Sequence, residues 1–219
     1  MTVYTAFEQM TVSGFGGPFG PSTWIFGIEF RVSAAATLTA VWSYSHIREM
    51  GLYRVAGQVQ VHTENLPDTG PASGGAWRRY PLTSPPALDA DVPYVLAVRT
   101  GNSAGAGGYF EQNGFFTGQS ITNGPLHVPS AETAAGGTQM RGTSNSPTVA
   151  FPSDDVPAGR AVLVADPEIE VAEPQGGGGP WRAWTGTQWA EGELKGWTGS
   201  AWAPVRAWDG TNWIPGGQS

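Results

Sequence analysis

The residues best suited to molecular recognition in this 219-residue chain are tryptophans that recur near its C-terminus. Each of three copies has a basic residue, then Trp two positions later, Gly two positions further on, and a second Trp five positions after the first. Because Thr-Gly or Asp-Gly between the two Trp residues is typical of tight turns, each copy predicts a short β-hairpin. The basic residues are Arg182, Lys195 and Arg206, and the Trp pairs are Trp184 and Trp189, Trp197 and Trp202, and Trp208 and Trp213.

These repeats need a partner, because 39 residues with few large aliphatic side chains rarely supply an adequate core. The simplest interpretation is that the indoles pack on one another, on copies in an oligomer, or on a neighbouring protein. A second is a surface on which flat indoles stack against sugars. Contact with a membrane interface is a third, which the scarcity of basic residues and the short apolar face disfavour.

Residues that could carry out catalysis are few. His46, His62 and His127 are scattered, without the spacing of a metal site, and no Gly-x-Ser-x-Gly motif marks a nucleophile. We therefore expect no enzymatic activity and no catalytic residue.

Carboxylates give one alternative, because loop carboxylates are ligands that Ca²⁺ favours. The candidates are Asp89, Asp91, Asp154 and Asp155, together with Asp166, Glu168 and Glu170, which alternate along one predicted strand. No twelve-residue calcium loop is present, so we expect no cofactor. A bound Ca²⁺ ion remains the alternative.

Composition excludes several functional classes. A net charge of -7 with a single lysine speaks against nucleic-acid binding, and no apolar run is long enough for a membrane-spanning helix. The absence of cysteine excludes disulfides and thiolate zinc sites. The first residues, Met1 to Glu8, lack the basic and apolar regions of a signal peptide, so we expect synthesis in a cytoplasm without one.

The chain divides by composition into a first domain at residues 1–173, a Gly-rich linker at 174–180, and the Trp repeats at 181–219. Glycine and proline together make up 50 residues, which favours an all-β fold with many turns. Alternating polar and apolar residues predict a β-sandwich of jelly-roll or immunoglobulin-like topology in the first domain. Leu38, Ala40, Trp42 and Tyr44 are predicted to face its core. The expected strands include residues 23–32, 52–63, 77–82, 94–100, 108–116 and 160–171.

Short motifs across residues 24–170 resemble a domain of unknown function found in bacterial surface and carbohydrate-active proteins. The motifs are Gly27-Ile-Glu-Phe30, Leu38-Thr-Ala-Val-Trp-Ser-Tyr44, Trp77-Arg-Arg-Tyr-Pro-Leu82, Pro86-Ala-Leu-Asp-Ala90, Tyr94-Val-Leu-Ala-Val98, Phe151-Pro and Ala161-Val-Leu-Val-Ala-Asp166. The resemblance implies a jelly-roll sandwich. Residues 45–51 depart from the pattern, so no ligand loop is carried over there.

The tandem Trp-x-Gly-x-x-Trp units behind a Gly-rich linker are similar to those of minor tail and other virion proteins of phages that infect actinobacteria. This resemblance implies a structural protein built into a virion, with lysis taking the place of secretion. We expect a minor tail protein that contacts other virion proteins through the Trp repeats and forms a homo-oligomer such as a trimer. The sandwich would face host surface glycans. The alternatives are a carbohydrate-binding module that grips cell-wall sugar through the Trp repeats, and a capsid decoration protein.

Overall fold

The computed structural model divides into two compact units, Met1–Val171 and Ala172–Ser219. It describes residues 1–7, 16–18, 23–44, 46–67, 77–100, 108–109, 111–112, 118–130, 133–134, 139–142, 146–155, 161–162, 164–172, 181–184, 189–192, 195–197, 202–204, 206–208 and 213–215. The expected linker at 174–180 lies outside these residues. Within them, the only helical element is the 3-10 turn η1 (Ala56–Gln58), so the all-β prediction is confirmed. The described part of the chain has no helix both long and apolar enough to cross a bilayer.

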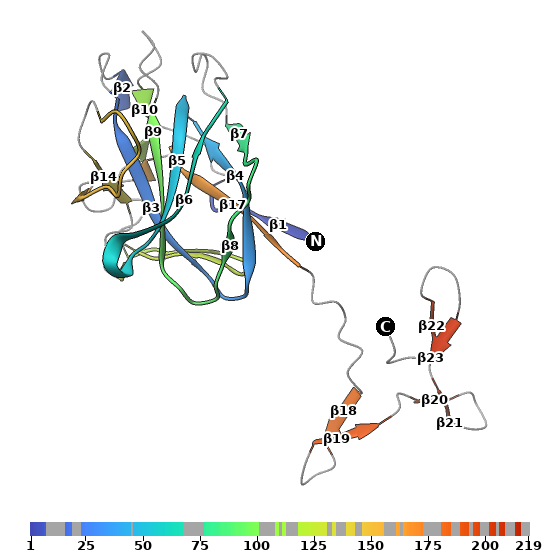
Figure 1. Ribbon diagram of the computed structural model, residues 1–219. Helices are drawn as coiled ribbons and strands as arrows, with labels where there is room; N and C mark the ends of the chain where they lie inside the picture. Colours follow the sequence, from blue (N-terminus) through green and yellow to red (C-terminus); the bar gives the residue numbers. More distant parts are fainter. Residues whose placement is uncertain are drawn as a thin grey trace. The chain divides into compact units, whose positions relative to one another are not determined.

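The first unit is a β-sandwich of two antiparallel sheets, as predicted (Figure 1). The smaller, five-stranded sheet has the order β1 (Thr2–Tyr4), β17 (Asp166–Val171), β4 (Ala36–Ser43), β7 (Arg78–Pro81), and β8 (Ala87–Leu88) also pairs with β4. The larger, eight-stranded sheet has the order β12 (Ile121–Asn123), β13 (Leu126–Val128), β3 (Ile25–Val32), β9 (Tyr94–Thr100), β5 (Ile47–Arg54), β6 (Val59–Asn65), with β14 (Gln139–Arg141) on β3 and β15 (Asp154–Asp155) on β14. Two short pairs join β2 (Gly16–Pro18) to β10 (Gly108–Tyr109) and β11 (Glu111–Gln112) to β16 (Ala161–Val162).

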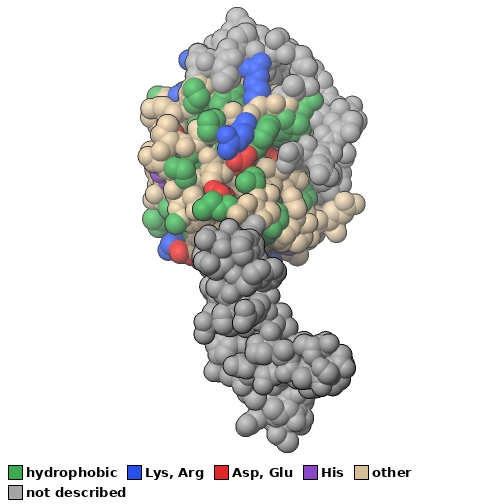
Figure 2. Space-filling view, turned by 90° about the vertical axis from the view of Figure 1, so that its right-hand side faces the viewer, with side chains coloured by type: hydrophobic (Ala, Val, Ile, Leu, Met, Phe, Trp, Pro, Cys, Tyr) green, Lys and Arg blue, Asp and Glu red, His purple; other side chains and the backbone are tan. Residues whose placement is uncertain are grey.

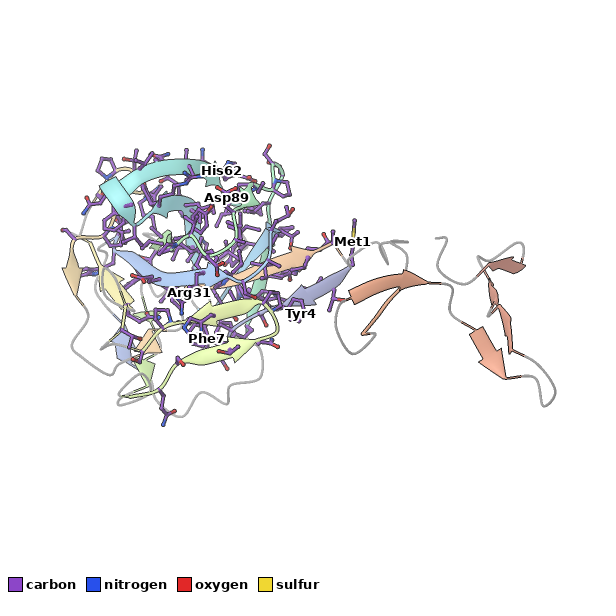
Figure 3. All side chains as sticks on the ribbon, turned by 90° about the horizontal axis from the view of Figure 1, so that it is seen from below. Met1, Tyr4, Phe7, Arg31, His62 and Asp89 are labelled. Atoms are coloured by element: carbon purple, nitrogen blue, oxygen red, sulfur yellow. The ribbon has the colours of Figure 1, made fainter. Side chains whose placement is uncertain are left out.

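The core between the sheets is built from alternate residues of the strands, because successive side chains of a strand point to opposite faces. Phe30 stacks on Tyr94 with ring centroids 5.9 Å apart, and both side chains are fully buried. The N-terminal segment contributes Phe7, which stacks on Trp77 at 6.3 Å. Figure 3 shows Phe7 inside the domain, whereas Met1 lies at the outer end of β1.

A second, smaller hydrophobic cluster covers the outer face of the larger sheet. It contains Ile25, Tyr53, Val95, Ala97 and Val149, with Val55 and Phe151 packed against it. Glu49 ties the covering segment to the sheet, because its Oε2 accepts hydrogen bonds from Val149 N and Arg99 Nε, each at 2.9 Å. The part of this face formed by β3, β5 and β9 is therefore covered by the protein's own chain.

Two expected strands are wrong in their bounds. Residues 160–171 contain β16 and β17, which belong to different sheets, and residues 164–165 between them are in no strand. Residues 52–63 do not form one strand: β5 ends at Arg54 and β6 begins at Val59, so they belong to a hairpin. Gly57, with φ of 72°, allows the tight turn between them. The continuous apolar and polar alternation across this turn concealed the reversal of the chain.

The predicted core face of residues 38–44 is wrong in part, because a β-bulge lies in the middle of β4. Ile169 lies opposite Leu38, but the preceding Glu168 lies opposite Ala40, so Thr39 is an extra residue. A bulge of this kind reverses which side chains face inward beyond it. Val41 and Leu38 both enter the core, while Trp42 belongs to neither hydrophobic cluster and lies on the outer face.

The second unit contains three hairpins, as predicted from the Trp repeat. They are β18 (Trp181–Trp184) with β19 (Trp189–Gly192), β20 (Lys195–Trp197) with β21 (Trp202–Pro204), and β22 (Arg206–Trp208) with β23 (Trp213–Pro215). The last pair before each loop joins the two tryptophans of one repeat. Each is a two-stranded sheet in the described part of the chain.

Candidate functional site

Four side chains, Thr39, Trp42, Arg79 and Glu168, form a connected group on the outer face of the smaller sheet; we call it the Trp42 cluster. Glu168 Oε1 accepts hydrogen bonds from Thr39 Oγ1 at 2.8 Å and Arg79 Nη2 at 2.6 Å. Its Oε2 accepts from Trp42 Nε1 at 2.7 Å and Arg79 Nε at 2.8 Å. Four donors from β4 and β7 therefore hold one carboxylate of β17.

The charges of this group are stabilised in the folded state. Burial acts to raise the pKa of Glu168, whose side chain is 5% exposed, but the hydrogen bonds from Arg79, Trp42 and Thr39 outweigh it and hold that pKa below its usual range. The hydrogen bond to Glu168 in turn raises the pKa of Arg79. Both partners are therefore ionised at neutral pH, and the bidentate contact orients the guanidinium.

The cluster lies within an open, mixed surface. Figure 2 looks onto the side of the domain where Figure 1 shows β1, β4, β7 and β17, and it shows basic, acidic and apolar side chains interspersed there. The strand registers add Val3, Thr37, Pro81 and Glu170 to the same face. Such a face offers fixed hydrogen-bond donors, an acceptor and one aromatic ring.

Asp166, two residues before Glu168, has a structural role. Its carboxylate is fully buried and accepts hydrogen bonds from Ala6 N at 2.7 Å and Phe7 N at 2.8 Å. These bonds fasten the chain that follows β1 to the start of β17. The side chain is thereby committed to the backbone rather than to a ligand.

We expect Asp166→Asn to lower the free energy of unfolding by about 2 kcal/mol, because an amide has one oxygen where two backbone N–H groups need acceptors. Denaturant titration would measure the change. Asp89→Asn is the control, because that side chain is 63% exposed and its loss should cost less than about 0.5 kcal/mol. Equal stability of the two variants would contradict the role given to Asp166.

Of the calcium candidates, Glu168 belongs to the Trp42 cluster, whereas the four loop candidates have other surroundings. Asp89 pairs with Arg54 Nη2 at 2.5 Å, and Asp91 lies in a turn with φ of 60°. Asp154 and Asp155 form β15 opposite Arg141 and Met140. Among the residues that the structure describes, no three His, Asp or Glu side chains come together to hold a metal ion.

The three histidines also lie in different places. His46 is buried just before β5, and His62 of β6 lies 3.3 Å from Glu64. His127 of β13 bonds Thr122 at 3.0 Å, and burial followed by the charge of Arg31 lowers its pKa. None of them belongs to the Trp42 cluster.

The basic residues of the Trp repeats occupy equivalent register positions. Arg182 lies opposite Glu191, whereas Lys195 and Arg206 lie opposite Pro204 and Pro215. Each repeat therefore forms the same hairpin, in which the two tryptophans lie opposite each other next to the loop.

Sequence reasoning missed Trp42, Arg79 and Thr39 as site residues, and it considered Glu168 only for calcium. The side chains that meet are far apart in the chain: Trp42 and Glu168 are separated by 126 positions, and Arg79 and Glu168 by 89. No local spacing could signal this arrangement. The period-two pattern pointed the other way, since it placed Trp42 in the core.

Residues 20–156 match a protein family described as "Domain of unknown function (DUF4082)", and this match spans more than half of the chain. The chain belongs to the DUF4082 family. The expected resemblance to a domain of unknown function is confirmed at this level. The DUF4082 match includes Trp42 and Arg79 but ends before Glu168, so it covers only part of the cluster. No curated protein matches the sequence significantly.

Proposed function

We propose that the protein is a non-enzymatic structural component of a phage virion, a minor tail protein that joins the particle through its Trp repeats. The observation that carries the proposal is the set of three hairpins, each with a Trp pair next to its loop. An isolated two-stranded hairpin is only marginally stable in water, so these units gain stability from association. The resemblance of the repeats to those of phage virion proteins supports the same assignment.

In this proposal the sandwich is the exposed part and the repeats are the anchor. Closed rotational symmetry would present several sandwiches around one axis, as in a trimer. The commitment of Asp166 to backbone groups argues for a non-catalytic role, because a glycosidase needs two accessible carboxylates across a cleft. The Trp42 cluster gives the sandwich a polar outer face suited to contact with host glycans.

The test compares incorporation of epitope-tagged proteins into particles during infection. We expect immunogold labelling to detect the full chain on purified virions. For a chain that ends at Glu173, the amount of protein on the virions should fall tenfold or more, because a loss of about 1.4 kcal/mol of binding free energy lowers an equilibrium constant tenfold. In the full chain, the double variant Trp208→Ala, Trp213→Ala should weaken incorporation, whereas Val61→Ala on β6 should not.

Two results would contradict the proposal, the first its anchoring role for the repeats and the second its assignment to the tail. The first is a truncated chain that still joins particles while residues 174–219, fused to a carrier, bind host envelopes; this would favour the carbohydrate-binding alternative for the repeats. The second is labelling over the head instead of the tail, which would favour capsid decoration.

A further inference from the structure

The Trp42 cluster contains an arginine that is oriented but only partly used. Arg79 gives its Nε–H and one Nη2–H to Glu168, and its side chain is still 43% exposed. A guanidinium has five N–H donors, so the other three have no bond to any described residue. The buried carboxylate of Glu168 holds the guanidinium in a fixed plane. The three remaining N–H groups are therefore oriented in advance for an acceptor from outside the protein.

Trp42 is fixed in a similar way. Its Nε1–H donates to Glu168 Oε2 at 2.7 Å, and the residue is neither fully buried nor part of a hydrophobic cluster. A surface ring that is already held in one orientation loses little conformational entropy when a ligand stacks on it. The bulge at Thr39 is what brings this indole to the outer face beside Arg79.

The charge around these two residues selects the class of ligand. Glu168 neutralises Arg79, and Glu170 adds a further carboxylate on the same face, opposite Val3 and Thr37. Phosphate or acidic sugar would therefore meet local negative charge on a chain that already carries a net charge of -7. A neutral ligand with hydroxyl groups can instead accept from Arg79 and donate to Glu170.

We propose that the outer face of the smaller sheet, centred on Trp42 and Arg79, binds a neutral saccharide. The indole stacks against the C–H face of a pyranose ring, and the unused guanidinium hydrogens donate to its hydroxyl groups. A protein partner fits less well, because the core of such an interface is rich in large apolar side chains and depleted of Asp and Glu. Here threonines, two carboxylates, an arginine and only small apolar side chains surround one ring.

The inference rests on the proposed function for its biological use, since an outward-facing sandwich is what would present this surface to a host. Binding by the purified full chain does not depend on particle assembly. The two proposals can therefore fail separately. If the full chain does not join particles, its sugar binding can still be measured, and if it binds no sugar, the anchoring role of the repeats is unaffected.

The experiment titrates the purified full chain with maltohexaose, cellohexaose, xylohexaose and β-1,4-galactohexaose, and with the hexamer of galacturonic acid as the acidic probe. Calorimetry measures affinity, and the indole N–H signal of Trp42 in a ¹H–¹⁵N spectrum, assigned by its absence in Trp42→Phe, reports on the site. We expect at least one neutral hexamer to bind and to shift that signal, with weaker or no binding of the acidic hexamer.

Variants then locate the binding. Trp42→Ala should weaken it by at least about tenfold, as for a stacking residue at the centre of a site. Trp42→Phe keeps a ring and should weaken it less, and Arg79→Lys should weaken it because lysine lacks the planar array of donors. Val61→Ala, on exposed β6 of the other sheet, is the matched control and should bind like the parent protein. Thermal unfolding of each variant separates lost binding from lost folding.

The proposal is overturned if no neutral hexamer binds, or if only the acidic hexamer does. It is also overturned if Trp42→Phe and Arg79→Lys, both folded, bind as tightly as the parent. Loss of binding in Trp208→Ala, with Trp42→Phe unaffected, would place the sugar on the Trp repeats instead.

Discussion

Replacing Glu168 by glutamine is expected to lower the free energy of unfolding by about 3 kcal/mol at pH 7. The carboxylate accepts four hydrogen bonds, two on each oxygen. Glutamine has one oxygen, so its amide nitrogen must face either Arg79 and Thr39 or Arg79 and Trp42. In both orientations it meets an N–H group of Arg79, which cannot accept a hydrogen bond. The expected cost lies at the lower end of the range for breaking a buried ion pair, because the Arg79 side chain is 43% exposed and water can reach it.

The effect of this substitution should depend on pH in a defined direction. The pKa of Glu168 in the folded protein lies below its ordinary value of 4.5. Its ionised form therefore contributes stability that is fully present above pH 4.5 and is lost as the pH falls through the folded-state pKa. The difference in unfolding free energy between parent and Glu168→Gln should be constant from pH 6 to 8 and should shrink below pH 4.5.

Urea titrations at pH 7 and pH 3 would measure both expectations. Glu170→Gln is the matched control, because it changes the same residue type two positions along β17 and should cost less than about 0.5 kcal/mol. Glu64, whose pKa is also lowered, is common to all three proteins, so its contribution cancels in the comparison. A Glu168→Gln penalty that stays constant to pH 3 would show that the ionised carboxylate does not hold the cluster.

Replacing Gly27 by valine is expected to cost about 3 kcal/mol, because overpacking of a close contact displaces the neighbouring chain. A Cβ atom at this position would lie 2.8 Å from Pro152 Cγ and 2.9 Å from Val95 Cγ1. Gly27 is thus a point of close approach between the covering segment and the larger sheet. Either that segment lifts away or β3 shifts, and both disturb the packing of Val149 and Phe151.

A double-mutant cycle identifies the source of the cost. Pro152→Ala removes the Cγ atom, so it should recover part of the stability lost in Gly27→Val. Calorimetric unfolding of the parent, the two single variants and the double variant gives the coupling energy. Additive effects of the two substitutions would show that Pro152 does not limit the space at Gly27.

The sandwich and the hairpins could be predicted because their signals are local. Strands such as β3 and β9 have apolar residues on both faces, and the turns between strands contain Gly, Pro and Asp. In the hairpins, Thr-Gly or Asp-Gly lies between paired tryptophans of one repeat, so a few neighbouring residues specify the turn. The reversal between β5 and β6 was missed because Gly57 sits in a run whose alternation continues through the turn.

The Trp42 cluster could not be predicted for the opposite reason. Whether Trp42 faces inward or outward depends on how β17 pairs with β4, and one extra residue in that pairing reverses the face. The sequence pattern from Leu38 to Tyr44 would be the same whether or not the strand contained a bulge, so the pattern does not reveal it. Arg79 reaches the same carboxylate only because β7 lies on the other side of β4.

By itself, then, the amino-acid sequence determined the all-β class, the three hairpins and the pairing of their tryptophans, since each follows from residues close together in the chain. The tertiary structure alone decided that Trp42, Arg79 and Glu168 meet on one outer face, because three strands distant in sequence must pair in a particular register before those side chains can touch. It also decided that Asp166 is a buried anchor for the N-terminal segment. A carboxylate becomes a ligand, an anchor or a positioning group according to the donors that the fold brings to it.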